Sequence, residues 1–258
     1  MASWVRFDHN GLVGFGTLHH DAITIHQGDM FANPTATNAS LSLDQVKVLT
    51  PTVPGKMIAL WNNFFALAEK LNLSVPSEPL YFLKADSSYL ATGETIRCPA
   101  AYDGKVVFEG ELGIVMGRVC RAVSDDEAKQ YIFGYTCIND VTAIELINKD
   151  RAFQQWARAK SFDTFGVFGP VVSTDLNPAE LTVKTELNGQ ERQNYRASDM
   201  IFQPARLVSL LSQDMTLYPG DVICCGTSVG VGSMKPGSTI AVTIDGIGTL
   251  VNRFEKSD

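Results

Sequence analysis

Residues 105–117 read K-V-V-F-E-G-E-L-G-I-V-M-G, and their hydrophobic pattern indicates the kind of fold that the chain adopts. Apolar residues alternate with others at the start of this stretch and become nearly continuous toward its end, which is typical of a β-strand that enters a buried core. Short runs of the same kind recur on both sides of it, including M-I-A-L-W at residues 57–61 and S-T-I-A-V-T-I near the C-terminus. Many short strands and few helices predict a mixed, β-rich α+β fold rather than a repeated strand–helix–strand unit.

The first 52 residues differ from the rest of the chain. They contain short apolar runs broken by polar and turn residues, and the stretch L-D-Q-V-K-V-L-T-P-T-V-P-G-K at residues 43–56 ends with two prolines and a glycine. Such a cluster is typical of a connection between structural units. We therefore expect a small N-terminal β-rich domain at residues 1–52 and a main body at residues 53–258.

Local signals predict particular elements in the main body. Ser124 is followed three residues later by Glu127, the spacing of a capping box, so a helix is expected to start at Ser124. Asn188 and Gly189 predict the turn of a β-hairpin. The apolar spacing in residues 62–72 and 204–215 predicts two helices.

Composition excludes several classes of function. A hydrophobic fraction of 45% and a charged fraction of 19% are those of an ordinary globular protein. The net charge of -7 argues against nucleic acid or an anionic membrane as a partner. No apolar run approaches the roughly 18 residues of a membrane span, and the first residues lack the pattern of a signal peptide, so a cytoplasmic location is expected. The five cysteines show no metal-binding spacing and predict neither a disulfide framework nor a thiolate zinc site.

All four histidines lie within the first 26 residues. An active site in the main body therefore has no imidazole unless one arrives from the N-terminal segment or from another subunit. We expect chemistry there to rest on carboxylates, lysines, hydroxyls, backbone amides or a metal bound through oxygen.

Glu109 and Glu111 flank a single glycine in the stretch at residues 105–117. Residues i and i+2 of a strand point to the same face, about 7 Å apart along the backbone, so the two carboxylates are expected to stand side by side. In apolar surroundings such a pair is costly unless a cation lies between the charges. Oxygen ligands suit a hard cation such as Mg²⁺, Mn²⁺ or Ca²⁺. The pair indicates a divalent-metal site, and two exposed glutamates on a solvated strand face are the alternative.

Three further positions could carry chemistry, although each has an ordinary alternative. Asp140 follows an apolar run and could be a turn or cap residue. Lys160 is either a surface lysine or a cation that faces a substrate. The loop G-T-S-V-G-V-G at residues 226–232 follows an apolar strand, and its backbone amides could converge on a carboxylate or phosphate. A plain hairpin loop is the alternative there.

Taken together, these stretches resemble the fumarylacetoacetate hydrolase family. The resemblance rests on E-G-E-L-G-I-V-M-G, I-F-G-Y-T-C-I-N-D-V-T-A, K-S-F-D-T-F-G-V-F-G-P and L-Y-P-G-D-V-I-C-C-G-T-S-V-G-V-G, in this order, and extends over about residues 53–253. It implies the β-sandwich roll of that family and a homodimer. It also implies a role for each candidate: Glu109, Glu111 and Asp140 bind Mg²⁺ or Mn²⁺, Lys160 is the active-site lysine, and Thr227 with the neighbouring amide of Gly226 binds the substrate carboxylate.

The chain departs from the family pattern at two places. The family often carries N-Y-x-x-H-x-x-E on a helix over the site, but Leu67 stands at the histidine position and Lys70 at the glutamate position. Glu69 is one position away and could act as the catalytic base only if the helix is rotated. Ile144 replaces an arginine of the family that binds substrate, which makes the expected pocket more apolar.

The resemblance implies an enzyme that acts on a small 2-oxo or β-diketo acid. We expect hydrolysis of a carbon–carbon bond in an acylpyruvate or a similar acid, because this is the commonest activity of the family. The departures leave two alternatives open. One is a metal-dependent 2-oxo acid decarboxylase or an enol isomerase similar to 2-hydroxyhepta-2,4-diene-1,7-dioate isomerase, and the other is a catalytically inactive paralogue that binds ligand.

Overall fold

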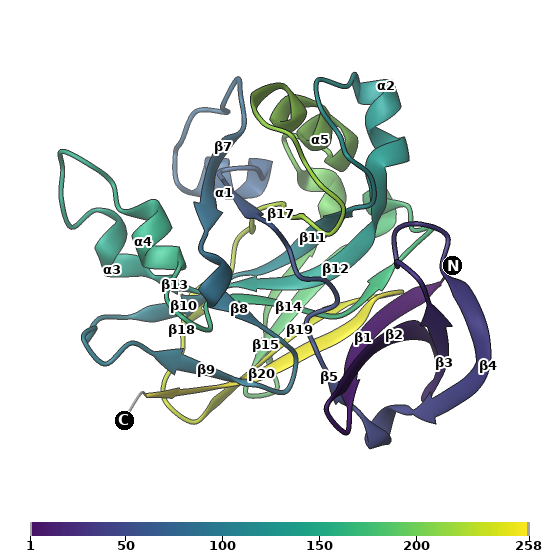
Figure 1. Cartoon of the computed structure of the whole chain (residues 1–258). Coiled ribbons are helices and arrows are strands. Elements are labelled where there is room, and N and C mark those ends of the chain that lie inside the picture. The colour runs from purple at the N-terminus through teal and green to yellow at the C-terminus, as the bar shows by residue number, and fades with distance from the viewer. Residues whose placement is uncertain (1, 257–258) are drawn as a thin grey trace.

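The structure, a computed structural model, describes residues 2–256 and consists mainly of β-strands (Figure 1). Strands make up 45% of it and helices 18%, so the expected β-rich fold is confirmed. The strands form three sheets, of twelve, five and three strands.

The large sheet joins the N-terminal strands to the main body. Ten of its strands follow the order β4-β3-β2-β1-β14-β12-β11-β17-β6-β7, while β5 pairs with β1 and β8 pairs with β14. The bounds of these strands are β1 (Ser3–His9), β2 (Leu12–His19), β3 (Ala22–Gln27), β4 (Thr35–Ser42), β5 (Lys47–Val48), β6 (Met57–Trp61), β7 (Leu80–Lys84), β8 (Tyr89–Leu90), β11 (Gly110–Met116), β12 (Ile132–Asp140), β14 (Gly166–Ser173) and β17 (Val222–Cys224).

The five-stranded sheet packs face to face against the large sheet. Its order is β16-β15-β19-β20-β9, and the three-stranded sheet has the order β13-β10-β18. The bounds are β9 (Thr95–Cys98), β10 (Val106–Phe108), β13 (Thr142–Ala143), β15 (Thr182–Leu187), β16 (Gln190–Arg196), β18 (Gly232–Ser233), β19 (Ser238–Ile244) and β20 (Gly248–Lys256). Contacts of β11 with β15, β12 with β19 and β14 with β20 form the sandwich.

Five α-helices lie outside the sheets, with α2 and α5 side by side above them in Figure 1. Their bounds are α1 (Phe65–Lys70), α2 (Asp125–Ala128), α3 (Ile144–Ile147), α4 (Trp156–Lys160) and α5 (Pro204–Asp214). The capping box is confirmed, since the Ser124 side chain accepts from the Glu127 amide and the Glu127 side chain accepts from the Ser124 amide. None of the helices in this part of the chain is long and apolar enough to cross a membrane.

The hairpin turn at Asn188 and Gly189 is also confirmed. Both residues have positive φ, 53° and 74°, and they connect β15 to β16. A two-residue turn with this backbone matches the twist of paired strands and favours asparagine followed by glycine.

The N-terminal strands continue the sheet of the main body. Ser3 of β1 pairs with Ser173 of β14, and β2, β3 and β4 follow outward as a curved layer, drawn in purple in Figure 1. Residues 1–52 therefore share backbone hydrogen bonds with residues 53–258, and their separation into a domain of their own stays a prediction.

Strand β11 is buried on both faces, which explains why all its residues after Glu111 are apolar or glycine. Leu112 and Ile114 belong to the core between the two larger sheets. Val115 points to the opposite side and packs in a second core cluster with residues such as Phe168 and Val222.

The prediction of a single strand at residues 105–117 is wrong, because the chain passes from one sheet to another at Glu109. Strand β10 pairs with β13 and β18, whereas β11 pairs with β12 and β17. At the break the Glu109 amide donates to Asn139 Oδ1 at 3.0 Å, and the Asp140 amide donates to the Glu109 carbonyl at 2.9 Å. The side chain of Asn139 thus accepts the hydrogen bond that a backbone carbonyl would accept in a regular strand pair, and Glu109 lies outside both strands.

Only glycine fits between the two glutamates. A Cβ atom on Gly110 would lie 2.0 Å from Thr185 Oγ1 of β15, so the backbone of β11 reaches the opposing sheet here. This close approach brings Glu109 and Glu111 deep into the sandwich.

We predict that Gly110→Ala lowers the free energy of unfolding by about 1–3 kcal/mol, the usual cost of overpacking a core. The matched control is the double variant Gly110→Ala/Thr185→Ala, which removes the atom that the new methyl group meets and should recover part of the loss. Thr185 Oγ1 has no hydrogen-bond partner, so Thr185→Ala by itself should cost less. Urea unfolding measures all three, and a Gly110→Ala variant as stable as the wild type would contradict the packing account.

Candidate functional site

The structure brings the carboxylate of Asp140 beside those of Glu109 and Glu111, about 30 residues earlier in the sequence. Ligand oxygens of Glu109, Glu111 and Asp140 lie within 4.8 Å of one another, and all three residues are buried. Glu109 and Glu111 flank Gly110, which pairs with Asn139 across β11 and β12. Asp140 therefore ends β12 beside the two glutamates.

Two buried lysines contact these carboxylates. Lys160, at the end of α4, donates from Nζ to Glu109 Oε2 at 2.8 Å and to Asp140 Oδ2 at 2.5 Å. Lys84, at the end of β7, donates from Nζ to Asp140 Oδ1, and its side chain is fully buried. Each ammonium group thus replaces lost hydration with charge-assisted hydrogen bonds.

Lys84 was missed by the sequence analysis. Its one local signal is its position at the inner end of the apolar run L-Y-F-L-K, two residues after Phe82 and so on the same face of the strand. Its carboxylate partner is 56 residues away, and no spacing rule connects the two.

The remaining bonds hold the glutamates in place. Thr142 Oγ1 donates to Glu109 Oε1 at 2.9 Å, and the Gly226 amide donates to Glu111 Oε2 at 2.9 Å. Glu111 Oε1 is buried and has no hydrogen-bond partner. A buried acceptor without a partner is costly, so this oxygen is available to a further ligand.

The pKa values follow from burial and from the neighbouring charges. Burial raises the pKa of Glu111 well above its ordinary value, and the charge of Asp140 raises it further. Burial acts the same way on Asp140, but Lys160 and Lys84 outweigh it and lower the pKa of that group. Burial alone would lower the pKa of Lys160, yet Asp140 and Glu109 outweigh it and raise the pKa, so Lys160 is charged at neutral pH.

These residues fit a hard divalent cation. Three carboxylates face two ammonium groups, which leaves one negative charge without compensation when all five groups are ionised. The donors are all oxygens, as Mg²⁺ and Mn²⁺ prefer, and Glu111 Oε1 lacks a partner. Glu109, Glu111 and Asp140 would hold the ion, and their role as ligands stays a prediction.

The loop at Gly226 and Thr227 lies against the same cluster. Thr227 Oγ1 donates to the Gly110 carbonyl at 2.9 Å and accepts from Gln193 Nε2 at 2.9 Å. Gln193 Oε1 in turn accepts from the Gly110 amide at 3.0 Å. The loop therefore fixes the backbone between the glutamates, and binding of a substrate carboxylate by Gly226 and Thr227 stays a prediction.

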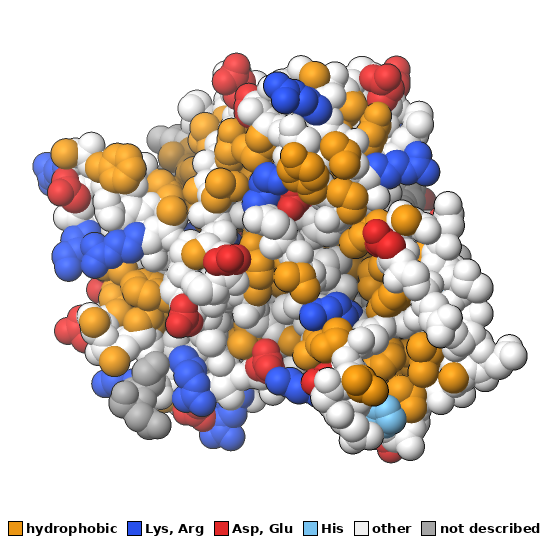
Figure 2. Space-filling view, in the orientation of Figure 1, with side chains coloured by type: hydrophobic (Ala, Val, Ile, Leu, Met, Phe, Trp, Pro, Cys, Tyr) orange, Lys and Arg blue, Asp and Glu red, His pale blue; other side chains and the backbone are white. Residues whose placement is uncertain are grey.

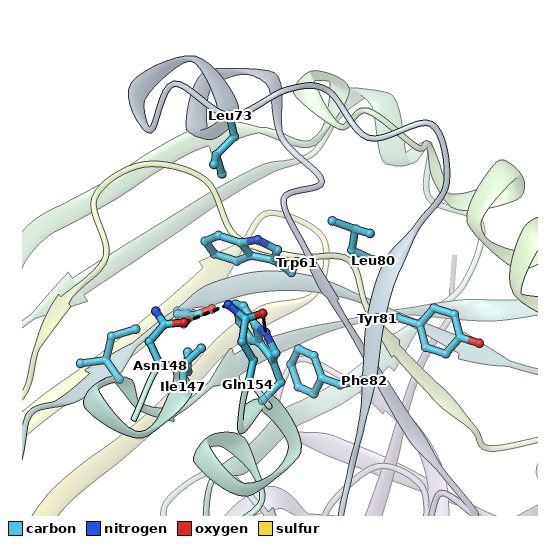
Figure 3. A pocket seen from close by; sticks show the side chains of 11 residues that line it. Trp61, Leu73, Leu80, Tyr81, Phe82, Ile147, Asn148 and Gln154 are labelled. Atoms are coloured by element: carbon cyan, nitrogen blue, oxygen red, sulfur yellow. Dashed lines mark hydrogen bonds between the residues drawn. The ribbon is translucent and has the colours of Figure 1, made fainter. Parts of the chain in front are cut away.

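A cavity of about 540 Å³ opens beside Glu109 (Figure 3). It lies between the end of β6, β7 and the segment from α3 to α4. Exposed hydrophobic side chains are gathered on this part of the surface (Figure 2), among them Leu73 and Leu80 at the cavity itself. The cavity is lined by Trp61, Leu73, Leu80, Tyr81, Phe82, Glu109, Ile144, Ile147, Asn148, Gln154 and Trp156.

The structure does not bring Glu69 to this site. Glu69 is exposed on α1 and is absent from the cavity lining, so the geometry gives no support to its expected role as the base. Leu67, at the position of the family histidine, is buried in the core. Ile144, which stands at the position of the family arginine, lines the cavity as expected. No histidine in residues 2–256 lines it.

Comparison with known families agrees with the fold and with this cluster. Residues 56–255 match the family described as Fumarylacetoacetate (FAA) hydrolase C-terminal, and residues 3–51 match the one described as Rv2993c-like, N-terminal. An uncharacterized protein of Archaeoglobus fulgidus is 44% identical over 216 residues, which are 84% of this chain and 85% of the relative. The oxaloacetate tautomerase YisK of Bacillus subtilis is 35% identical over 227 residues, covering 83% of this chain and 74% of the relative.

Solved structures share the whole fold. The 2-hydroxyhepta-2,4-diene-1,7-dioate isomerase of Mycobacterium marinum superposes with a TM-score of 0.91 at 35% identity, over 100% of this chain and 99% of the other. The maleylpyruvate hydrolase of Sphingobium sp. SYK-6, in complex with manganese(II) and pyruvate, gives a TM-score of 0.80 at 25% identity, over 99% of this chain and 100% of the other.

We predict that the wild-type protein binds one Mn²⁺ per chain and that Glu111→Gln weakens this binding at least tenfold. The glutamine keeps the size of the side chain and an oxygen for the Gly226 amide but removes the ligand charge. Glu69→Gln is the matched control, because Glu69 is an exposed glutamate outside the cluster. Titration followed by the electron paramagnetic resonance of free Mn²⁺ measures the affinity. Equal affinities for wild type and Glu111→Gln would remove Glu111 from the ligand set.

We predict that the stability of the metal-free protein falls as pH rises. Glu109 and Glu111 have raised pKa values in the folded protein, whereas an unfolded glutamate titrates near about 4.3. The metal-free folded chain then holds more protons than the unfolded chain, so its free energy of unfolding falls as pH rises from about 4.3 through the raised pKa values. Mn²⁺ requires the ionised carboxylates, and its stabilising effect should grow over the same range.

Thermal unfolding between about pH 5 and about pH 8, in EDTA and in Mn²⁺, measures both slopes. Glu111→Gln should make the decline in EDTA less steep, since it removes one of the two titrating groups. A metal-free protein whose stability rises with pH throughout this window would contradict the assignment.

Proposed function

Since the chain belongs to the fumarylacetoacetate hydrolase family, we propose that it is a metal-dependent enzyme that interconverts the keto and enol forms of a 2-oxo acid. In this reaction a proton leaves C3 of the acid and a proton is added to the 2-oxo oxygen. The observation that carries the proposal is the buried cluster of three carboxylates and two lysines at the inner end of a cavity that offers no histidine in the described residues.

The cluster would act on the 2-oxo carboxylate end of the substrate, here called its head. When bound, Mg²⁺ or Mn²⁺ supplies Lewis acidity to the 2-oxo carboxylate group and so favours its enolate. Glu109 is the carboxylate that lines the cavity, and Thr142 and Lys160 fix both of its oxygens. The head of the acid therefore meets a group whose orientation is set before binding, which lowers the cost of the reaction.

Lys160 would act as a fixed positive charge. Asp140 and Glu109 raise its pKa against the effect of burial, which favours the charged form of its side chain. Such an ammonium group stabilises negative charge that develops on the 2-oxo oxygen. Lys160 also contacts an aromatic ring, because its Nζ lies 5.4 Å from the centre of the Phe82 ring that lines the cavity. This contact helps to fix the position of the ammonium group.

The absent histidine favours proton transfer over hydrolysis. Hydrolysis needs a base that activates water, and the family position for that base is occupied by the buried Leu67. Tautomerisation needs no attacking water: the C3 proton passes to solvent water in the open cavity, and water returns a proton to the 2-oxo oxygen. The similarity to an oxaloacetate tautomerase supports this order of preference.

Hydrolysis of a carbon–carbon bond in a β-diketo acid is the second candidate. It is supported by the similarity to maleylpyruvate hydrolase, whose structure contains manganese and pyruvate together. In that reaction water adds to the acyl carbonyl, the carbon–carbon bond breaks, and the pyruvyl part leaves as an enolate that takes up a proton. Decarboxylation of oxaloacetate would pass through the same enolate.

The test follows oxaloacetate and acetylpyruvate with Mg²⁺, with Mn²⁺ and with EDTA, and measures each product separately. We expect enolisation of oxaloacetate, read as the change in enol absorbance, to depend on the metal. Release of acetate from acetylpyruvate would favour hydrolysis, and release of CO₂ would favour decarboxylation. No metal-dependent reaction of either acid, with proven metal binding, would favour the inactive paralogue.

We predict that Lys160→Met lowers kcat by about 10²–10³-fold, the usual effect of removing one group that stabilises a developing oxyanion. Binding of Mn²⁺ should persist or tighten, because the cluster loses a positive charge but keeps its three carboxylates. Steady-state kinetics and the Mn²⁺ titration measure the two effects on the same preparation, with Glu69→Gln as the control of unchanged kcat. A Lys160→Met enzyme with wild-type kcat would exclude this role.

A further inference from the structure

The cavity beside Glu109 has an aromatic wall built from three elements. Trp61 ends β6, Phe82 lies in β7 and Trp156 begins α4. The ring centres of Trp61 and Trp156 are 5.0 Å apart, and those of Phe82 and Trp156 are 5.8 Å apart at 24° between their planes. The planes of Trp61 and Trp156 are tilted by 42°, so the three rings form an angled apolar wall, and a further planar group can stack on an open ring face.

The polar side chains of the wall are bonded to one another. Gln154 Nε2 donates to Asn148 Oδ1 at 2.9 Å, and Trp156 Nε1 donates to Gln154 Oε1 at 3.0 Å. Figure 3 shows the first of these bonds across the lower side of the cavity, with the ring of Phe82 directed toward Gln154. These bonds hold the wall together, so the amides contribute to its shape more than to binding of a charged group.

Positive charge is confined to the inner end of the cavity. Lys160 lies behind Phe82 and contacts Glu109, whereas no lysine, arginine or histidine in residues 2–256 lines the cavity itself. Ile144 occupies the position at which the family pattern has an arginine. A carboxylate placed in the outer part of the cavity would lose hydration without gaining a cationic partner from the lining.

The cavity has room beyond the head of a 2-oxo acid. Its volume of about 540 Å³ falls within the roughly 300–1,000 Å³ of small-molecule sites. Leu73, Leu80 and Ile147 complete the lining together with the aromatic rings. This surface is largely apolar and adjoins Glu109 of the carboxylate cluster.

We propose that the substrate is a 2-oxo acid whose far end is a planar apolar group, such as an aromatic ring, and not a second carboxylate. The inference rests on the proposed function for the head of the acid. The ring stacks on the wall formed by Trp61, Phe82 and Trp156, and Ile144 excludes a charged end.

Phenylpyruvate and oxaloacetate test this directly, because they share one head and differ only in the group on C3. Nuclear magnetic resonance follows the exchange of the C3 protons with deuterium, and this experiment uses Mg²⁺-loaded rather than Mn²⁺-loaded protein. After subtraction of the uncatalysed rate, the exchange rate reports enolisation of each acid. We expect kcat/KM to be about tenfold or more higher for phenylpyruvate, the scale of apolar discrimination in a pocket. A higher kcat/KM for oxaloacetate would overturn the inference and leave the proposed function intact.

Binding gives a second readout that does not need turnover. Two of the three tryptophans, Trp61 and Trp156, line the cavity, so their fluorescence should be quenched saturably by phenylpyruvate at lower concentrations than by oxaloacetate. If neither acid reacts, the proposed function fails, and the order of the two binding constants still decides the inference. Equal or reversed constants would overturn it.

Ile144→Arg should shift the ratio of kcat/KM values at least tenfold toward oxaloacetate, since it supplies a cation for the second carboxylate. Ile144→Met is the matched control, because it keeps the side chain apolar and should keep the preference for phenylpyruvate. Leu80→Lys places a cation at another position of the cavity lining, where the native residue is 46% exposed, and covers the case in which Ile144→Arg does not fold. An unchanged ratio in folded cationic variants would overturn the inference.

Discussion

The molecule depends on the burial of three carboxylates that two lysines cannot fully compensate. Lys160 and Lys84 hold Asp140, and Lys160 also holds Glu109, whereas Glu111 keeps one oxygen without a partner. An uncompensated buried charge is costly, so burial raises the pKa of Glu111 in the metal-free protein, and a divalent cation at this place would stabilise the ionised cluster. The same features that would weaken the metal-free protein would favour binding of a hard divalent ion.

The sandwich supplies the geometry that this cluster requires. The chain leaves one sheet and enters another at Glu109, and only a glycine at position 110 lets β11 approach β15 closely enough. Thr227 and Gln193 hold the same backbone from the side of the C-terminal loop. The large sheet, the opposing sheet and the loop therefore meet at Glu109 and Gly110. The helices α3 and α4 complete the cavity outside this point.

Local sequence patterns predicted the parts of the site that lie on one strand or follow one, and failed where distant segments meet. The spacing of Glu109 and Glu111 indicated a metal site, and the family resemblance added Asp140 and Lys160. Lys84 could not be found this way, because its burial depends on the packing of β7 near Asp140. The strand break at Glu109 was missed for the same reason, since it depends on pairing with residues far along the chain. The apolar cavity was foreseen only in part, through Ile144.

The central claim is that Glu109, Glu111 and Asp140 together bind a divalent cation. Anomalous X-ray diffraction from crystals grown with Mn²⁺, recorded above and below the manganese absorption edge, locates the ion directly. The account predicts one strong anomalous peak among the three carboxylates, about 2.0–2.2 Å from an oxygen of each, the range of a hard six-coordinate ion. An absent peak at saturating Mn²⁺, or a peak bound by other residues, would contradict it.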